Sequence, residues 1–81
     1  MELRKVFAKN LRALRVGAGL SQEELAFRAD IDRTYVSALE RGLYSASIVT
    51  IEKLAKALEA DPAAFLKRPG KSSVRRAEPT P

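Results

Sequence analysis

Apolar side chains recur every three or four residues along most of this chain, which is the spacing of one face of an α-helix. The first stripe consists of Leu3, Phe7, Leu11 and Leu14. Gly17 and Gly19 follow it and favour the end of a helix. The pattern predicts a first helix over about residues 2–16.

A capping signal opens the second helix. Ser21 can accept a hydrogen bond from a backbone N–H of the first turn, and Glu24 stands where it can complete a capping box. Leu20 precedes the cap and can pack against Leu25 as a hydrophobic staple. The helix therefore begins at Gln22, and its buried face is predicted to comprise Leu25, Ala26 and Ala29.

A third helix follows after a tight turn. Asp30 occupies the turn, because Asp tolerates the left-handed conformation better than most residues, and Asp32 can cap the helix that follows. Gly42 marks its end. Val36 and Leu39 face inward, and the outward positions are Arg33, Thr34, Ser37 and Arg41. Two short helices joined in this way predict a helix-turn-helix.

Two further helices are predicted. Ser47 can cap a fourth helix, whose apolar face comprises Ile48, Ile51, Leu54, Ala55 and Leu58. Asp61 followed by Pro62 opens a short fifth helix that runs to Leu66. No apolar periodicity continues beyond that residue. The prediction is an all-α chain with five helices in one compact domain over residues 1–66, and a basic, flexible tail over 67–81.

Composition narrows the classes of function. The 81 residues suffice for one small domain, and they include no cysteine and no histidine. Without these residues the usual zinc ligands and the easiest general-base and nucleophile chemistries are missing, and we expect no metal, no cofactor and no enzymatic activity. No apolar run reaches the length of a membrane span, and the start of the chain lacks the apolar stretch of a secretory signal. We expect a cytoplasmic protein with no membrane partner.

The net charge of +5 is unevenly distributed. Residues 1–15 carry five basic groups and one acid, residues 16–66 carry five and eight, and residues 67–81 carry five and one. A basic first helix suits contact with phosphates, and a basic tail suits loose electrostatic association. Ordinary solvated surface is the other interpretation of the helix, and simple disorder is the other interpretation of the tail.

Residues 22–41 resemble the helix-turn-helix of the Cro and lambda-repressor type, the Xre family. Gln22 opens the motif, Ala26 stands at the close-crossing position, and Val36 and Leu39 form the core of the recognition helix. Within that family, the run from Asp32 to Ser37 and the triplet 39–41 are most similar to controller proteins of restriction-modification systems. The turn holds Asp where the family usually has Gly, and residues 43–47 lack the basic residues or proline of many members. The resemblance implies a compact, lambda-repressor-like DNA-binding domain that acts as a dimeric regulator of transcription. The narrower resemblance to controller proteins implies regulation of its own operon.

Candidate base contacts lie on the exposed side of the recognition helix. Arg33 on its first turn can bind guanine O6 and N7 bidentately, or it can pair with Asp30 instead. Thr34 and Ser37 can each contact a base edge or a phosphate. Tyr35 can stack on a base step, as the resemblance implies, or pack against Phe27 in the core. Ala38 offers only a methyl group to a base.

Candidate phosphate contacts come from other elements. Gln22 places an amide and the N-terminus of the second helix where a phosphate can dock. Arg41, with Tyr44 or Ser45 in the following loop, can form a second clamp, or Arg41 can instead stabilise the C-terminus of its own helix. The resemblance also implies a structural ion pair between Arg15 and Glu40, which fixes the angle of the recognition helix.

One recognition helix covers about half of an operator, so we predict a homodimer on double-stranded DNA with a pseudo-palindromic site. The expected interface comprises Leu58, Ala63, Phe65 and Leu66, with Phe65 folded into the monomer core as the alternative. No small-molecule effector is indicated in so short a chain. The alternative function is an antitoxin-type interaction module that covers a toxin, since a helix-turn-helix fold alone does not settle function.

Overall fold

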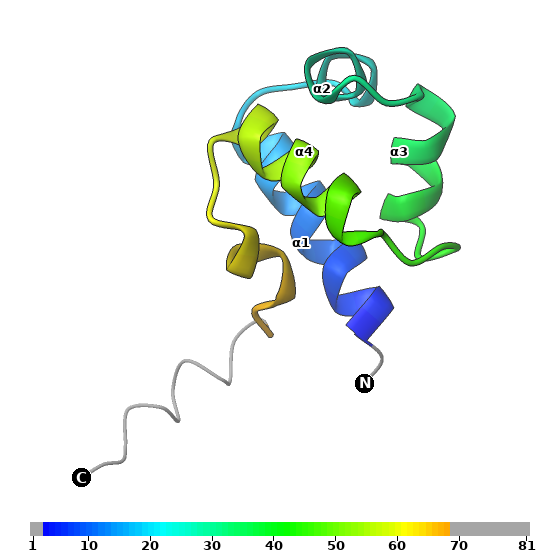
Figure 1. The fold of residues 1–81 in the computed structure, drawn as a ribbon, viewed down its shortest axis with the longest axis vertical. Coiled ribbons are helices and arrows are strands. Elements are labelled where there is room, and N and C mark those ends of the chain that lie inside the picture. Colours follow the sequence, from blue (N-terminus) through cyan, green and yellow to red (C-terminus); the bar gives the residue numbers. More distant parts are fainter. Residues whose placement is uncertain (1–2, 69–81) are drawn as a thin grey trace, which may run out of the picture.

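The computed structural model describes residues 3–68, which form four α-helices and a terminal 3-10 helix (Figure 1). The elements are α1 (Leu3–Gly17), α2 (Gln22–Ala29), α3 (Arg33–Glu40), α4 (Ile48–Leu58) and η1 (Pro62–Leu66). The all-α class is confirmed, and no strand occurs in the described part of the chain. None of the helices there is long and apolar enough to cross a membrane. All of the predicted tail beyond residue 68 lies outside the described residues.

The predicted fifth α-helix is wrong in kind, because η1 is a 3-10 helix of five residues. Asp61 caps it through the Ala63 N–H at 3.1 Å, as predicted, and the Ala64 N–H donates to the Asp61 carbonyl at 2.8 Å. A segment this short, with a proline at its start, has few N–H groups with which to build an α-helical ladder.

The capping signals act as predicted at two of three α-helix starts. Ser21 accepts from the Glu24 N–H at 3.0 Å, while the Glu24 carboxylate accepts from the Ser21 N–H at 2.9 Å, which completes the capping box. Ser47 accepts from the Thr50 N–H at 3.1 Å. Asp32 stands at the N-cap of α3, but its side chain makes no capping hydrogen bond. The prediction that Asp32 caps α3 is therefore wrong for its side chain.

Within residues 3–68, two non-glycine residues adopt the left-handed conformation, and both end a helix. Asp30 has φ 60° in the turn between α2 and α3, as its residue type predicted. Glu59 has φ 53° after α4, where its N–H reaches the carbonyls of the last turn. Glutamate is an unfavourable residue for this conformation, and glycine is the usual one.

The four α-helices and η1 share one apolar core. Its fully buried members come from every element: Leu11, Leu25, Val36, Leu39, Leu54 and Phe65. Phe65 packs on Phe7 of α1, with 5.4 Å between ring centroids. Asn10 fastens the same region, because its side-chain amide donates to the carbonyls of Phe65 and Lys67, each at 2.8 Å.

This arrangement corrects one expectation about the interface between protomers. Phe65 is 0% exposed, so it belongs to the core of the monomer and cannot face a second chain. The alternative given for this residue is the one that the structure shows. Two contacts that the sequence analysis did not include explain it: the Phe7 ring covers one side of Phe65, and Asn10 binds its backbone.

Candidate nucleic-acid interface

Helix α3 lies at the edge of the molecule, with one side packed inward and the other free (Figure 1). Val36 and Leu39 are fully buried on the inner side. On the outer side Arg33 and Thr34 are exposed and Ser37 is half-buried. Three polar side chains of one short helix therefore share a surface that nothing covers in the monomer.

Arg33 has the freedom that a base contact requires. Its side chain is exposed on the first turn of α3, and no ion pair with Asp30 is recorded in the described part of the chain. The guanidinium carries five N–H donors in a fixed fork, which matches the two acceptors of guanine in the major groove. The geometry suits the bidentate contact predicted for this residue.

Thr34 is held in one orientation by Asp32. The threonine hydroxyl donates to the Asp32 carboxylate two residues earlier. The proton of the hydroxyl is therefore in use, and the methyl group and an oxygen lone pair remain for other contacts. Of the roles predicted for Thr34, contact with a thymine methyl fits this orientation, whereas donation to a phosphate would break the bond to Asp32.

The structure separates Tyr35 from Phe27. Tyr35 is half-buried and packs against the core, which leaves part of its ring at the surface. Phe27 is 86% exposed and is not a core partner for it. Ala38 is buried at 6% exposure, so the idea that its methyl group meets a base is wrong.

An ion pair between Arg15 and Glu40 lies behind the exposed surface. The Arg15 Nε donates to Glu40 Oε2 at 2.6 Å and Nη2 donates to Oε1 at 3.1 Å, while Nη1 donates to the Leu20 carbonyl at 2.8 Å. The two side chains are only 10% and 3% exposed. The hydrogen bonds to Glu40 raise the pKa of Arg15 above its ordinary value and outweigh the opposing effect of burial, so the guanidinium stays charged.

Gln22 joins this pair from the start of α2. Its side-chain amide donates to Glu40 Oε1 at 3.1 Å. Glu40 thereby connects the end of α3 to α1 and to the first residue of α2. The sequence analysis did not include the contact between Gln22 and Glu40, because eighteen positions separate the two residues and no periodicity relates them.

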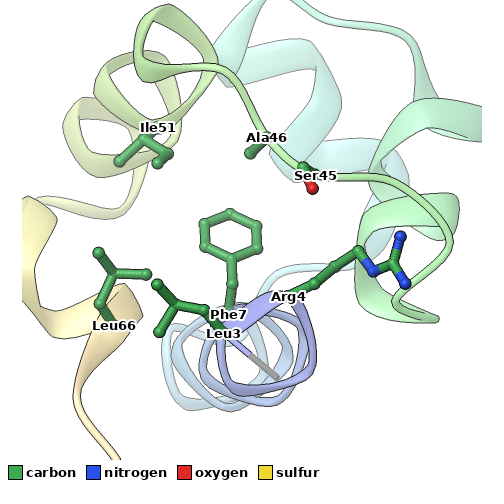
Figure 2. Close-up of a pocket in the computed structure, with 7 residues that line it drawn as sticks. All are labelled: Leu3, Arg4, Phe7, Ser45, Ala46, Ile51 and Leu66. Atoms are coloured by element: carbon green, nitrogen blue, oxygen red, sulfur yellow. The ribbon is translucent and has the colours of Figure 1, made fainter. Parts of the chain in front are cut away.

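The remaining predicted phosphate contacts lie in the loop after α3. Arg41 and Tyr44 are exposed there, with Gly42 between them in the left-handed conformation at φ 73°. Ser45 is exposed too, but it lines a hollow at the start of α4 (Figure 2). Arg41 and Tyr44 thus point to solvent beside α3, whereas Ser45 belongs to the wall of a different feature.

The residues predicted for the dimer interface do not share one environment. Leu58 is half-buried against the core, and Phe65 is inside it. Ala63 and Leu66 are exposed, and Leu66 borders the same hollow as Ser45.

Comparison with known proteins places this geometry in context. A family model described as helix-turn-helix, HTH_3, matches residues 11–65. A Neisseria meningitidis protein named as a hypothetical transcription factor is 53% identical over 57 residues, which cover 70% of this chain and 54% of that protein. The chain therefore spans about half the length of this relative.

A control protein and a restriction-modification controller protein are also similar. Control protein C.BamHI from Bacillus amyloliquefaciens is 43% identical over 61 residues, which cover 74% of this chain and 75% of that protein. The crystal structure of the controller protein C.AhdI from Aeromonas hydrophila superposes with a TM-score of 0.74 at 47% identity, and covers 76% of this chain and 94% of that one.

Proposed function

Because the chain belongs to the helix-turn-helix family HTH_3, and its relatives here include a hypothetical transcription factor and a control protein, we propose that it binds one operator sequence-specifically as a homodimer. The observation that carries the proposal is the outer side of α3. Arg33, Thr34 and Ser37 are accessible there, while the buried Glu40 at the end of the same helix fixes its position. A rigid element that carries polar side chains is what reading of base edges requires.

The positions of the residues determine which of them contact bases and which contact phosphates. Arg33, Thr34 and Ser37 contact bases, and the exposed edge of Tyr35 adds a stacking surface. Gln22, Arg41 and Tyr44 contact phosphates on either side of α3, and Ser45 contributes less because it faces the hollow. Phosphate contacts set the register of the protein on the duplex, and base contacts select the sequence.

The dimer follows from the size of the reading surface. A single α3 covers about half of an operator, and regulators that dock in this way place two recognition helices about 34 Å apart on a pseudo-palindromic site. The similarity to C.BamHI and C.AhdI favours a controller that regulates its own operon beside a restriction-modification pair. The domain comprises residues 1–66, it acts in the cytoplasm where its DNA is, and its function is binding rather than catalysis.

Fluorescence anisotropy tests the proposal. Wild type and Arg33→Ala are titrated against DNA from immediately upstream of the gene and against scrambled DNA, at two salt concentrations. We expect wild type to prefer the upstream DNA by ~10³ or more, and Arg33→Ala to lose most of this preference while it retains salt-dependent binding. Equal and weak binding of both proteins to both DNAs would contradict the proposal and direct the search to a protein partner.

A further inference from the structure

Asp32 stands at the N-cap of α3, but its side chain does not cap the helix. Its backbone carbonyl accepts from the N–H groups of Tyr35 and Val36, which starts the helix, while its carboxylate bonds no N–H group of the first turn. The N-cap serines of α2 and α4 both make the expected bond. Departures from such local rules are expected at functional sites, so the exception at the start of α3 indicates a use for this carboxylate outside the helix.

The Asp32 carboxylate is bound instead by the side chain of Thr34. Its Oδ2 accepts from the Thr34 hydroxyl at 2.5 Å, and both residues are exposed. Within residues 3–68, this carboxylate makes no ion pair and its Oδ1 accepts no hydrogen bond. An exposed and oriented acceptor oxygen therefore stands next to Arg33, at the start of the proposed reading surface.

A carboxylate on this surface has few favourable partners on a DNA duplex. When ionised it only accepts hydrogen bonds, and phosphates and many base atoms are acceptors too. The donors of the major groove are the amino groups of cytosine and adenine. Adenine presents the acceptor N7 beside its amino group, whereas cytosine presents only the N4 donor. Cytosine is thus the base that suits Asp32.

Arg33 and Asp32 together complement the edge of a G·C pair. The arginine offers donors to guanine N7 and O6, and the aspartate offers an acceptor to cytosine N4. The two residues are adjacent in the chain, and both are exposed where α3 begins. The positive charge of Arg33 also offsets the repulsion between the Asp32 carboxylate and the phosphates.

From these observations we propose that Asp32 determines specificity by accepting a hydrogen bond from a cytosine N4 amino group, at or next to the G·C pair that Arg33 reads. The inference rests on the proposed function and adds a base contact to it. Thr34 is the positioning residue, because its hydroxyl holds Oδ2 and leaves Oδ1 available. Asp32 also rejects other sequences, since a carboxylate that meets an acceptor loses its hydration without gaining a partner.

Binding selection from a pool of randomised duplexes tests the inference on the full chain. Selections with wild type, Asp32→Ala and Asp32→Asn are compared. Asp30→Asn is the matched control, because it removes the same charge from an exposed residue two positions earlier, and asparagine tolerates the left-handed conformation there. Asp32→Ala removes no capping bond, so we expect the fold to be retained, and circular dichroism checks it.

The expected result is a change at one position of the selected sequence. Wild type and Asp30→Asn should select a cytosine that Asp32→Ala prefers at least about fivefold less, the lower range of what one base pair contributes. Asp32→Asn should accept adenine there instead, because an asparagine amide matches adenine N6 and N7. A methyl group on N4 of that cytosine removes the hydrogen that faces the groove and keeps the base pair. It should weaken wild type and leave Asp32→Ala unaffected.

The role of Thr34 has a separate readout. Thr34→Val removes the hydroxyl that holds Asp32, and it should lower the preference for the same cytosine without changing the rest of the selected sequence. A preference that Thr34→Val leaves at the wild-type level would overturn the positioning role.

The remaining outcomes separate this inference from the proposed function. Identical selected sequences for wild type and Asp32→Ala would overturn the role of Asp32 and leave the proposed function standing, because the other contacts of α3 still choose the operator. Loss of all selection by Asp32→Ala would also overturn it, since that result assigns Asp32 to the structure of α3. Absence of any selected sequence for wild type would contradict the proposed function and this inference together.

Discussion

The side-chain amide of Gln22 donates a hydrogen bond to the carboxylate of Glu40, so that the first residue of α2 and the last residue of α3 share one contact. The same carboxylate accepts two hydrogen bonds from Arg15. A residue proposed to contact a phosphate is thereby held by the group that positions the reading helix. Under the proposed function, the contact of Gln22 with the DNA backbone and the angle of α3 are therefore linked through Glu40.

Replacing Gln22 should affect all DNA alike. Gln22→Ala removes a proposed phosphate contact, and phosphates carry no sequence information. We expect anisotropy titrations to show operator and scrambled DNA weakened by the same factor, of about 3 to 10, consistent with one lost hydrogen bond. Arg33→Ala is the contrasting variant, because it should weaken the operator alone. A loss for Gln22→Ala confined to the operator would assign Gln22 to base reading instead.

Breaking the ion pair between Arg15 and Glu40 should lower the stability of the fold. Arg15→Met leaves the Glu40 carboxylate buried without its main partner, and we expect the free energy of unfolding to fall by about 3–5 kcal/mol in urea denaturation. Arg12→Met, at an exposed arginine of the same helix, is the control and should change stability by less than about 0.5 kcal/mol. Removing both charges with Arg15→Met and Glu40→Met should recover much of the loss. Equal stability of the two single variants would refute a structural role for the pair.

The orientation of Thr34 predicts which of its groups reads DNA. Because its hydroxyl donates to Asp32, we expect the methyl group to contact a thymine methyl. Thr34→Val keeps the methyl and should retain the discrimination of wild type between operators with thymine and with uracil at that position. Thr34→Ser keeps the hydroxyl and should lose a discrimination of about fourfold, the worth of one buried methyl group. If anisotropy instead shows that Thr34→Ser retains the discrimination between thymine and uracil and that Thr34→Val loses it, the hydroxyl is the group that reads DNA.

Neighbouring residues of η1 should behave differently on truncation. Phe65→Ala empties a fully buried site, and we expect it to lower the unfolding free energy by about 3–5 kcal/mol at protein concentrations where dimers are dissociated. Leu66→Ala, at 42% exposure, should cost much less under those conditions. Leu66→Ala should instead raise the Kd of the proposed dimer. A small effect of Phe65→Ala on the monomer would contradict its place in the core.

Glu59 offers a stabilising substitution. Its left-handed conformation costs a residue with a Cβ about 1–2 kcal/mol, and the flexibility of glycine in the unfolded chain offsets about half of that. We expect Glu59→Gly to raise the unfolding free energy by about 0.5–1 kcal/mol. Lys53→Gly, inside α4 and exposed, is the control and should lower it by about 1 kcal/mol. If thermal denaturation shows that Lys53→Gly is more stable than Glu59→Gly, the expectation is wrong.

The features that could be predicted from the sequence are those that depend on nearby residues. The capping box at Ser21, the cap at Ser47, the turn at Asp30 and the buried stripes all arise within one or two helical turns. Side-chain caps of this local kind mark the starts of α2, α4 and η1. The buried stripes also place Arg33 and Thr34 on an outer surface.

The features that were missed depend on contacts between distant segments. Asn10 binds carbonyls that follow it by more than fifty positions, and the burial of Phe65 depends on Phe7. The burial of Ala38 reflects how closely α3 approaches the rest of the fold, which no spacing within α3 reveals. Ile48 was likewise placed on the apolar face of the fourth helix, yet it is 83% exposed, because the apolar stripe of α4 does not tell which of its members the core reaches.

If α3 reads DNA as proposed, few of its positions can change during evolution to alter the sequence that is read. Of its eight residues, Val36, Ala38 and Leu39 are buried, Glu40 holds the ion pair, and Tyr35 is partly in the core. Arg33, Thr34 and Ser37 are the three that can be exchanged without disturbing the packing. Under the proposed function, a lineage that acquires a new operator changes its base contacts at these three positions, and related regulators that share the fold can avoid one another's promoters through the same three residues.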